Sequence, residues 1–280
     1  MKVPIAKVNL TTNEINSVLE PLKNGWLVQS RTFNTFENIG NPTYAVQRFS
    51  EWMCDEIVYL DISTDNNYDL KRSDINYKNR KTFLDIIKDV SKVSFMPLTV
   101  GGKINSLKKI EKYLKLGADK ISINTQAILD KNFVNSAAKE FGSQSIVVSV
   151  DVKKYNSNYM VMQNKPKKYV TKYEVTEWVK IMEEEGAGEI LLNSYDKDGL
   201  KKGYDIKLID LVNKKLNIPL IPIGGAGKLN HFSNLLNKTN IDTIAAANFF
   251  HHYDQSYYLL KKYLFEKKYN VRKHEFNIWS

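Results

Sequence analysis

The stretch Gly188-Glu-Ile-Leu-Leu-Asn-Ser-Tyr-Asp-Lys-Asp-Gly-Leu-Lys-Lys-Gly-Tyr204 joins a short apolar segment to a polar, glycine-containing loop. Its first part, Glu189 to Asn193, is typical of a buried β-strand because it is short, apolar and followed by turn residues. Asp196, Asp198 and Gly199 come directly after this strand. Barrels of the α/β type keep their chemistry at this end of their strands. The stretch therefore predicts one unit of a barrel, with a functional loop after the strand.

A second segment, Ile221-Pro-Ile-Gly-Gly-Ala-Gly-Lys228, repeats the arrangement one unit later in the chain. Its glycines allow backbone amides to approach an anion closely, and the helix expected after it would point its N-terminus at the same place. Two such units in tandem predict a barrel that binds a phosphorylated sugar.

The rest of the chain alternates short apolar runs with amphipathic segments, which is typical of a parallel sheet covered by helices. We expect a single (β/α)8 TIM barrel, because no Pro/Ser-rich linker divides the 280 residues and such barrels have about 250. Seven strands are expected, with an eighth in doubt near the N-terminus: Glu56–Ile62, Ser94–Val100, Lys120–Asn124, Ser145–Asp151, Glu189–Asn193, Pro219–Ile223 and Thr243–Ala247. The expected helices are Pro42–Trp52, Asn79–Val90, Ser106–Leu116, Tyr173–Glu184, Ile206–Leu216, Leu229–Asn237 and Gln255–Phe265.

One segment interrupts this alternation. Residues Lys153 to Tyr169 hold the apolar run Tyr159-Met-Val-Met162 between polar flanks. This pattern predicts a small hairpin inserted after the fifth strand, placed as a flap over the site.

Composition limits the class of protein. The chain has no apolar run of the ~18 residues that a membrane span needs and no signal-peptide pattern, so a cytoplasmic protein is expected. The single cysteine, Cys54, excludes an intramolecular disulfide and offers no metal cluster. No cofactor is indicated. The net charge of +10 suits an anionic small molecule, a nucleic acid or a lysine-rich solvated surface. We favour the solvated surface, since the basic residues are scattered and no RNA-binding aromatic motif accompanies them.

From about Asn24 to Tyr269 the chain resembles the cyclase subunit of imidazole glycerol phosphate synthase. Several motifs carry the resemblance, in order and at matching spacing: Asp55–Ile62, Pro97–Gly102, Gly117–Thr125, Phe141–Gln144, Val147–Asp151, Gly186–Leu192, Asp196–Gly199 and Gly224–Lys228. The resemblance implies a (β/α)8 barrel with a phosphosugar site at its C-terminal face. It also implies use of ammonia from a separate glutaminase subunit docked on the opposite face as a heterodimer.

The resemblance implies two catalytic aspartates, at the ends of the first and fifth strands. Asp151 matches the second, and a carboxylate over a barrel mouth is well placed to move protons. Its alternative interpretation is a helix or loop cap. The first aspartate would lie four residues before Gly25, where the chain has Pro21. Proline cannot titrate, so we expect that the usual two-carboxylate mechanism is lost.

Residues 1–23 form an atypical N-terminal segment before the cyclase-like residues 24–280. Thr11-Thr-Asn-Glu14 matches a capping box, and the apolar residues from Ile15 to Leu22 follow at helical spacing. Residues 1–29 also resemble the start of a sugar aminotransferase that uses pyridoxal phosphate, but no cofactor lysine motif follows. Either Ile5–Leu10 or Val18–Leu22 could supply strand one, and the sequence leaves both alternatives open.

Phosphate cradles are implied at two places. Gly101, Gly102, Asn124 and Thr125 resemble one cradle, and Asp198, Gly199, Gly225, Ala247 and Asn248 resemble the other. An isolated glycine turn is more often ordinary strand-to-helix geometry, but several at strand ends favour anion binding. Three replacements indicate an altered pocket: Lys103 for a usual glycine, Ile223 for serine and Asn193 for threonine.

Charged residues at strand starts resemble the family's ammonia gate and glutaminase docking surface: Glu56, Asp119, Lys120 and Glu189. A structural ring of salt bridges is the alternative, since buried charges at such positions need partners. The gate's arginine would fall at Ile15, so the ring is incomplete here.

Three functions follow as hypotheses. The favoured one is a paralogue that supplies ammonia to a sugar amidotransferase in surface-polysaccharide biosynthesis, because Asn24–Gln29 and Asn38–Pro42 resemble that branch. The second is a genuine cyclase of histidine biosynthesis, with its missing acid supplied by a residue such as Glu20. The third is a non-catalytic scaffold that activates a glutaminase.

Overall fold

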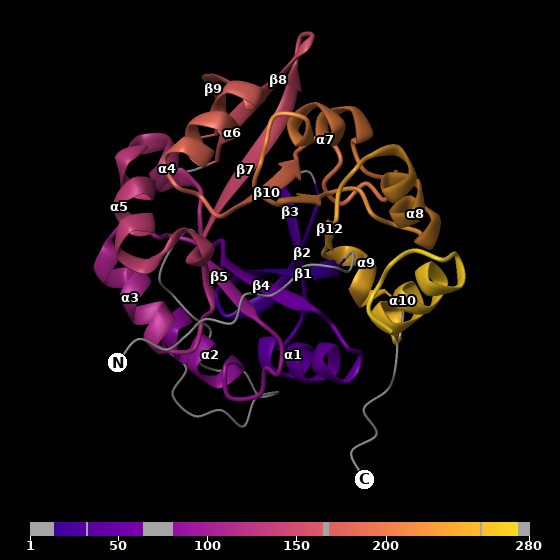
Figure 1. Cartoon of the computed structure of the whole chain (residues 1–280). Helices are drawn as coiled ribbons and strands as arrows, with labels where there is room; N and C mark the ends of the chain where they lie inside the picture. The colour runs from indigo at the N-terminus through magenta and orange to yellow at the C-terminus, as the bar shows by residue number, and fades with distance from the viewer. Residues whose placement is uncertain (1–13, 32, 64–80, 165–167, 253, 274–280) are drawn as a thin grey trace.

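The computed structural model describes residues 14–31, 33–63, 81–164, 168–252 and 254–273, with side chains described from Leu22 onward. Parallel strands form a central ring with helices outside it (Figure 1). A continuous ladder runs from β11 through β10, β7, β6, β5 and β4 to β1, which also pairs with β12. β12 lies beside β11, so the ring closes into a (β/α)8 barrel as expected. The ring strands are β1 Glu14–Lys23, β4 Glu56–Asp61, β5 Leu98–Gly101, β6 Lys120–Ile123, β7 Ile146–Tyr155, β10 Glu189–Ser194, β11 Leu220–Ile223 and β12 Thr243–Ala246.

The outer layer consists of helices whose apolar faces cover the strands. They are α1 Pro42–Glu51, α2 Phe83–Val90, α3 Leu107–Lys115, α4 Thr125–Leu129, α5 Asn132–Phe141, α6 Val175–Glu184, α7 Ile206–Asn213, α8 Leu229–Lys238, α9 Asn248–His251 and α10 Ser256–Glu266. Local sequence explains two of the starts. Pro42 opens α1 after the N-cap Asn41, whose side chain accepts from the Thr43 amide. Thr82 and Asp85 form a reciprocal capping box at α2.

Strand β1 corrects one prediction. Residues Ser17 to Leu22 pair with Glu56 to Asp61 of β4, so the helix expected from the apolar spacing after Glu14 is wrong. The neighbouring edges of β4 and β12 offer this segment a full set of backbone partners, and this context overrides a local helical pattern. Of the two alternatives for strand one, Val18–Leu22 supplies it, and Ile5–Leu10 lies outside the described residues. The boundary at residue 23 stays a prediction.

Two antiparallel excursions leave the ring. One is the hairpin of β2 (Trp26–Arg31) and β3 (Thr35–Gly40), which the sequence pattern did not predict. The other extends β7 to Tyr155 and adds β8 (Asn158–Gln163) and β9 (Tyr169–Glu174), which confirms the hairpin expected after the fifth strand. In Figure 1 the tip joining β7 and β8 projects beyond the ring of helices. Both excursions leave from the C-terminal ends of ring strands.

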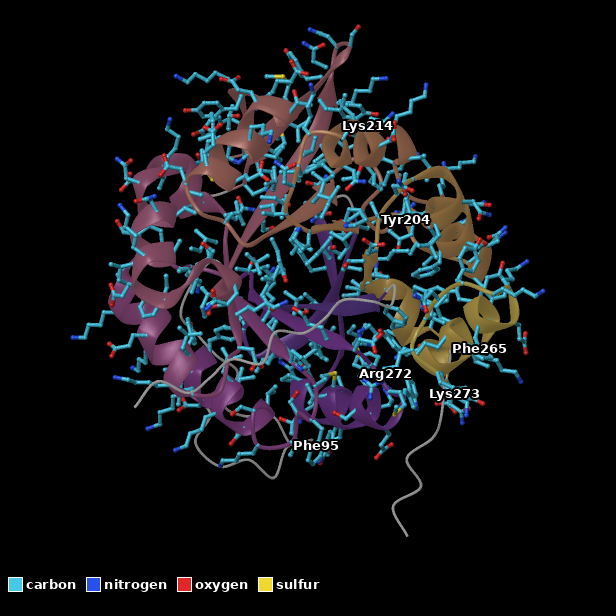
Figure 2. The ribbon with its side chains drawn as sticks, viewed as in Figure 1. Phe95, Tyr204, Lys214, Phe265, Arg272 and Lys273 are labelled. Atoms are coloured by element: carbon cyan, nitrogen blue, oxygen red, sulfur yellow. The ribbon has the colours of Figure 1, made fainter. Side chains whose placement is uncertain are left out.

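The core has two shells because strand residues alternate between the barrel interior and the helices. The inner shell is apolar and is built from one or two residues of several ring strands: Val58, Val147, Leu191, Ile221, Ile223 and Ala245. The outer shell is larger and includes Trp178, Phe49 and Phe232 from the helices. Tyr204 is also buried here and donates from its hydroxyl to the Ala245 carbonyl (Figure 2). The helix α5 in this shell was missed from sequence, although Phe133, Val134 and Ala137 give it a buried apolar face.

Candidate active site at the barrel mouth

Asp151 lies inside the C-terminal mouth of the barrel, on β7, and its side chain is buried. Two side-chain amides hold the same carboxylate oxygen, Oδ2. Asn124, at the end of β6, donates from Nδ2 at 2.9 Å, and Asn164, just after β8, donates from Nδ2 at 2.6 Å. The predicted catalytic residue is therefore a buried carboxylate fixed by neutral donors and not a helix cap.

Burial raises the pKa of Asp151 to about 6, because the charged form loses its hydration. Hydrogen bonds from Asn124, Asn164 and Asn193 favour the charged form and limit the rise, while the carboxylate of Asp198 adds to it. A carboxyl group with a pKa near 6 exists in both protonation states around neutral pH. It can therefore accept and return a proton during one reaction cycle.

The β2–β3 hairpin lies against Asp198. Ser30 Oγ lies 3.0 Å from both carboxylate oxygens, and the Phe33 amide donates to Oδ2 at 3.1 Å. The Phe33 ring stacks on Tyr195, with centroids 4.8 Å apart and planes nearly parallel. Lys168 donates to the Phe33 carbonyl at 2.7 Å. These contacts join the β2–β3 hairpin to the loop after β10 and to Lys168, just before β9. Sequence reasoning missed Ser30, Phe33 and Lys168 as parts of the site. No short motif marks them.

The first predicted phosphate cradle comes together at the ends of β5 and β6. A Cβ on Gly102 would lie 2.2 Å from the Asp61 carbonyl oxygen, and one on Gly101 would lie 2.6 Å from Leu60. Both glycines are thus required by close packing on β4, whatever they bind. Thr125 begins the short helix α4 directly after Asn124, whose amide is already committed to Asp151.

The second predicted cradle lies under the β2–β3 hairpin. Gly199 packs on it so closely that a Cβ would lie 2.4 Å from the Ser30 carbonyl oxygen. Asn248 donates from Nδ2 to that same carbonyl at 3.0 Å, and Ala247 precedes it as the N-cap of α9. Gly225 has a φ of +100° and accepts at its carbonyl from the Gly203 amide. The predicted residues therefore lie together, and phosphate binding there stays a prediction.

Asp61 and Lys103 are a charged pair that the resemblance did not supply. The Lys103 ammonium lies 3.3 Å from Asp61 Oδ2, beside the Gly101–Gly102 turn. Lys103 has a φ of +55°, a conformation that glycine adopts more easily. The Lys109 ammonium donates to the Lys103 carbonyl. Burial lowers the pKa of Lys109. The replacement of glycine by Lys103 thus adds positive charge to this side of the mouth.

A second charged site lies at the opposite, N-terminal end of the barrel. Lys120 Nζ lies 2.7 Å from Glu189 Oε1 and 3.0 Å from Glu56 Oε2. Thr99 Oγ1 donates to the other Glu56 oxygen at 2.6 Å. Burial opposes the charged form of Lys120, but the two glutamates outweigh it and raise its pKa. Burial also raises the pKa of Glu56 because its charged form loses hydration, and the Glu189 carboxylate adds to the rise while Lys120 opposes it. We name these three charged residues, Glu56, Lys120 and Glu189, the basal ring.

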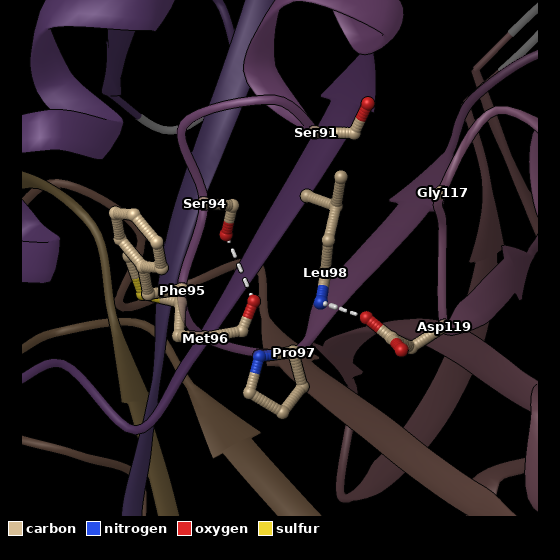
Figure 3. A pocket seen from close by; sticks show the side chains of 8 residues that line it. All are labelled: Ser91, Ser94, Phe95, Met96, Pro97, Leu98, Gly117 and Asp119. Atoms are coloured by element: carbon tan, nitrogen blue, oxygen red, sulfur yellow. Dashed lines mark hydrogen bonds between the residues drawn. The ribbon is translucent and has the colours of Figure 1, made fainter.

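Asp119 does not join the basal ring in the described residues. Its carboxylate accepts from the Leu98 amide at 2.8 Å and so ties the starts of β5 and β6 together (Figure 3). It lines a surface pocket at this face with Ser91, Ser94, Phe95, Met96, Pro97, Leu98 and Gly117. Phe95 is 81% exposed at the rim, and Figure 2 places it at the edge of the molecule.

The position of the missing first aspartate is fixed by register. Pro21 pairs with Leu60 of β4, one residue before the Leu22–Asp61 pair at the mouth. A proline in the chain there supplies neither a carboxylate nor a backbone N–H. The side chain of Glu20 lies outside what the structure describes, so its suggested role as a replacement acid stays a prediction.

Two features are absent from the described ranges. These residues contain no group of three or more His, Cys, Asp or Glu side chains placed to hold a metal ion. They also contain no helix with the length and apolar character needed to cross a membrane. Cys54 is buried and unbridged.

Comparison with known proteins places this geometry in a family. Residues 21–256 match the family model described as histidine biosynthesis protein. A relative in Sulfurisphaera tokodaii named imidazole glycerol phosphate synthase subunit HisF is 39% identical, over 94% of this chain and its own full length. Relatives of the same name in Hydrogenobaculum sp. and Clostridium botulinum are 39% and 37% identical, over 90% and 89% of this chain and 95% and 94% of theirs. The chain therefore belongs to the histidine biosynthesis protein family.

Proposed function

We propose that this chain is a cyclase-type subunit of imidazole glycerol phosphate synthase. It would take ammonia at the basal ring and use it on a phosphorylated substrate at the mouth, as its HisF relatives' name suggests. The observation that carries the proposal is Asp151: a buried carboxylate with a pKa of about 6, at the strand end where barrels of this type act. The comparisons favour this function over the amidation role expected from the sequence.

The basal ring supports the entry of ammonia. It lies at the start of β4, β6 and β10, and the inner apolar shell separates it from Asp151, which lies on β7 at the other end of the barrel. An apolar interior suits neutral ammonia and disfavours ammonium and water. A glutaminase subunit docked over the pocket beside Phe95 would release ammonia next to the ring. We further propose that the complex is a cytoplasmic heterodimer and that the predicted cradles bind the substrate phosphates.

The test is cyclase turnover of the purified chain with ammonium and the ribulosyl aminoimidazole-carboxamide substrate. Asp151→Asn keeps the shape and the hydrogen bonds of the side chain but cannot titrate. We expect it to lower kcat by about 10²–10⁴-fold, the usual contribution of a general acid or base. Turnover that survives in this variant would overturn the role of Asp151.

Pro21 favours a second candidate. Without the first aspartate, the chain would lack the family's second proton-transfer group and could pass ammonia on to a sugar amidotransferase of surface-polysaccharide biosynthesis. A folded wild-type chain that shows no cyclase turnover, yet stimulates a glutaminase and delivers its ammonia to a sugar acceptor, would replace the first proposal with this one. Stimulation without delivery or phosphosugar binding would indicate a scaffold.

A further inference from the structure

Three asparagines surround Asp151, from three different parts of the chain. Asn124 and Asn164 donate to its Oδ2 atom, and Asn193 is its direct partner in the register of β10 against β7. Asn193 also favours the charged form of Asp151 and so limits the rise of its pKa. The amide nitrogens of Asn124 and Asn164 are thus directed at one charge, and Asn193 lies beside it.

Two of the three asparagines have an amide oxygen that accepts no hydrogen bond in the part of the chain that the structure describes. Asn164 Oδ1 and Asn193 Oδ1 are buried and have no hydrogen-bond partner among the described residues. For Asn164 the amide orientation follows from the network, because a carboxylate oxygen at 2.6 Å requires the NH₂ group to face it. A buried amide oxygen without a donor is destabilising, because it loses its hydrogen bond to water and gains none in the protein. Two such oxygens beside the reactive carboxylate indicate a site built for a ligand that donates.

The surroundings restrict what that ligand is. The site presents oxygen acceptors, and the side chains below it belong to the inner apolar shell, including Ile223, which pairs with Asn193 in register. A ligand with several N–H donors and no acceptor can satisfy these oxygen acceptors. A positive charge on that ligand would also be attracted by the Asp151 carboxylate and so strengthen the binding of the ligand. A phosphate group would be repelled by the two amide oxygens and by the Asp151 carboxylate. Ammonium has this chemistry, and its neutral form, ammonia, is the species that the apolar interior of the barrel admits.

We propose that the side-chain oxygens of Asn164 and Asn193, together with the Asp151 carboxylate, form a receiving site that holds ammonia as ammonium at the barrel mouth. Ammonia arriving through the barrel takes the proton of protonated Asp151, which gives an ammonium ion and a carboxylate. The ion returns that proton to Asp151 when its nitrogen attacks the substrate, so charge and protons balance. The inference rests on the proposed function and names the residues that position its nitrogen source.

The binding test needs no turnover. The melting temperature of the whole chain is measured at pH 7.5 in ammonium chloride and in tetramethylammonium chloride at equal concentration, since the second ion has no N–H donor. We expect ammonium to raise the Tm of the wild type in a saturable way, as any ligand of the folded state does. Asn193→Thr keeps an oxygen acceptor and should keep the rise in Tm. Asn193→Val has the shape of the threonine variant but no acceptor, so it should lose the rise in Tm.

The same variants separate this inference from the proposed function. If the chain is a cyclase, Asn193→Val and Asn164→Leu should raise the KM for ammonium about tenfold and leave the KM for the phosphorylated substrate unchanged. If the chain shows no turnover, the Tm comparison still decides the receiving site. An equal ammonium effect in wild type and Asn193→Val, or no difference between the two salts in wild type, would overturn it.

Discussion

The two ends of the barrel both bury charge, but they stabilise it in opposite ways. At the basal ring, one lysine bridges two glutamates through direct ion pairs of 2.7 and 3.0 Å and offsets part of their charge. At the mouth, Asp151 has no cationic partner in the described residues and is held by neutral amides. The comparison thus distinguishes the basal ring, whose charges are held by ion pairs, from Asp151, whose protonation state can change.

The difference has a physical origin. An ion pair fixes the protonation of both partners, because removing either charge leaves the other buried without compensation. Amide donors stabilise a carboxylate more weakly than a cation does, so burial still raises the pKa of Asp151 to about 6. The basal ring is thus suited to a constant gate, and the mouth is suited to proton transfer.

The largest expected effect tests the basal ring. Lys120→Met keeps most of the side-chain volume but leaves Glu56 and Glu189 without their shared cation. We expect it to lower the free energy of unfolding by about 3 kcal/mol, the scale measured when one partner of a buried ion pair is removed. Urea unfolding at pH 7.5 measures this.

Lys115→Met is the matched control. Lys115 is also ion-paired, with Glu111 one turn earlier, but its side chain is 73% exposed. We expect little or no loss of unfolding free energy, because exposed ion pairs contribute little to stability. Equal losses in the two variants would show that the basal ring is no more important to stability than a surface pair.

The second prediction concerns pH at the mouth. The folded-state pKa of Asp151 lies above its ordinary value of 3.8, so the folded chain holds this proton more tightly than the unfolded chain. The resulting stabilisation is complete below about pH 4 and is lost as the pH rises through 6. Asp151→Asn removes this dependence. Relative to wild type, the variant should therefore gain stability with rising pH, to about 3 kcal/mol above pH 7.

Unfolding of both proteins at pH 4, 6 and 8 checks this sign. A wild-type chain that loses no stability relative to Asp151→Asn between pH 4 and 8 would mean that Asp151 has an ordinary pKa. The contrast between the mouth and the basal ring would then disappear.

The smallest effect tests the hairpin over the mouth. Ser30→Ala removes a hydroxyl that lies 3.0 Å from both oxygens of Asp198, so we expect a loss of about 1 kcal/mol in unfolding free energy. Ser91→Ala is the control, since its hydroxyl donates to a helix carbonyl at an exposed position. Hydrogen exchange of the amides in β2 and β3 should quicken in Ser30→Ala alone. Unchanged exchange would show that Asp198 does not hold the hairpin.

Particular residues show how far sequence reasoning reached. The Glu189–Asn193 strand and its loop were predicted because short apolar runs and glycine turns are local signals. Asp151 and the basal ring lysine were predicted through the resemblance. The β2–β3 hairpin and Asn164 were missed, because their importance comes from contacts with residues distant in sequence: Ser30 with Asp198, and Asn164 with Asp151 across the β7–β8 turn.

The sequence by itself determined the alternation of strands and helices, the closed barrel and the identity of the titratable residues. Hydrophobic periodicity and side-chain chemistry are properties of the local sequence and need no knowledge of tertiary contacts. The tertiary structure alone decided that residues 14–23 form a strand, that Lys120 bridges two glutamates and that two asparagine oxygens remain beside Asp151. Each of these depends on which segments meet in space. Strand partners, desolvation and hydrogen-bond geometry exist only once the ring has closed.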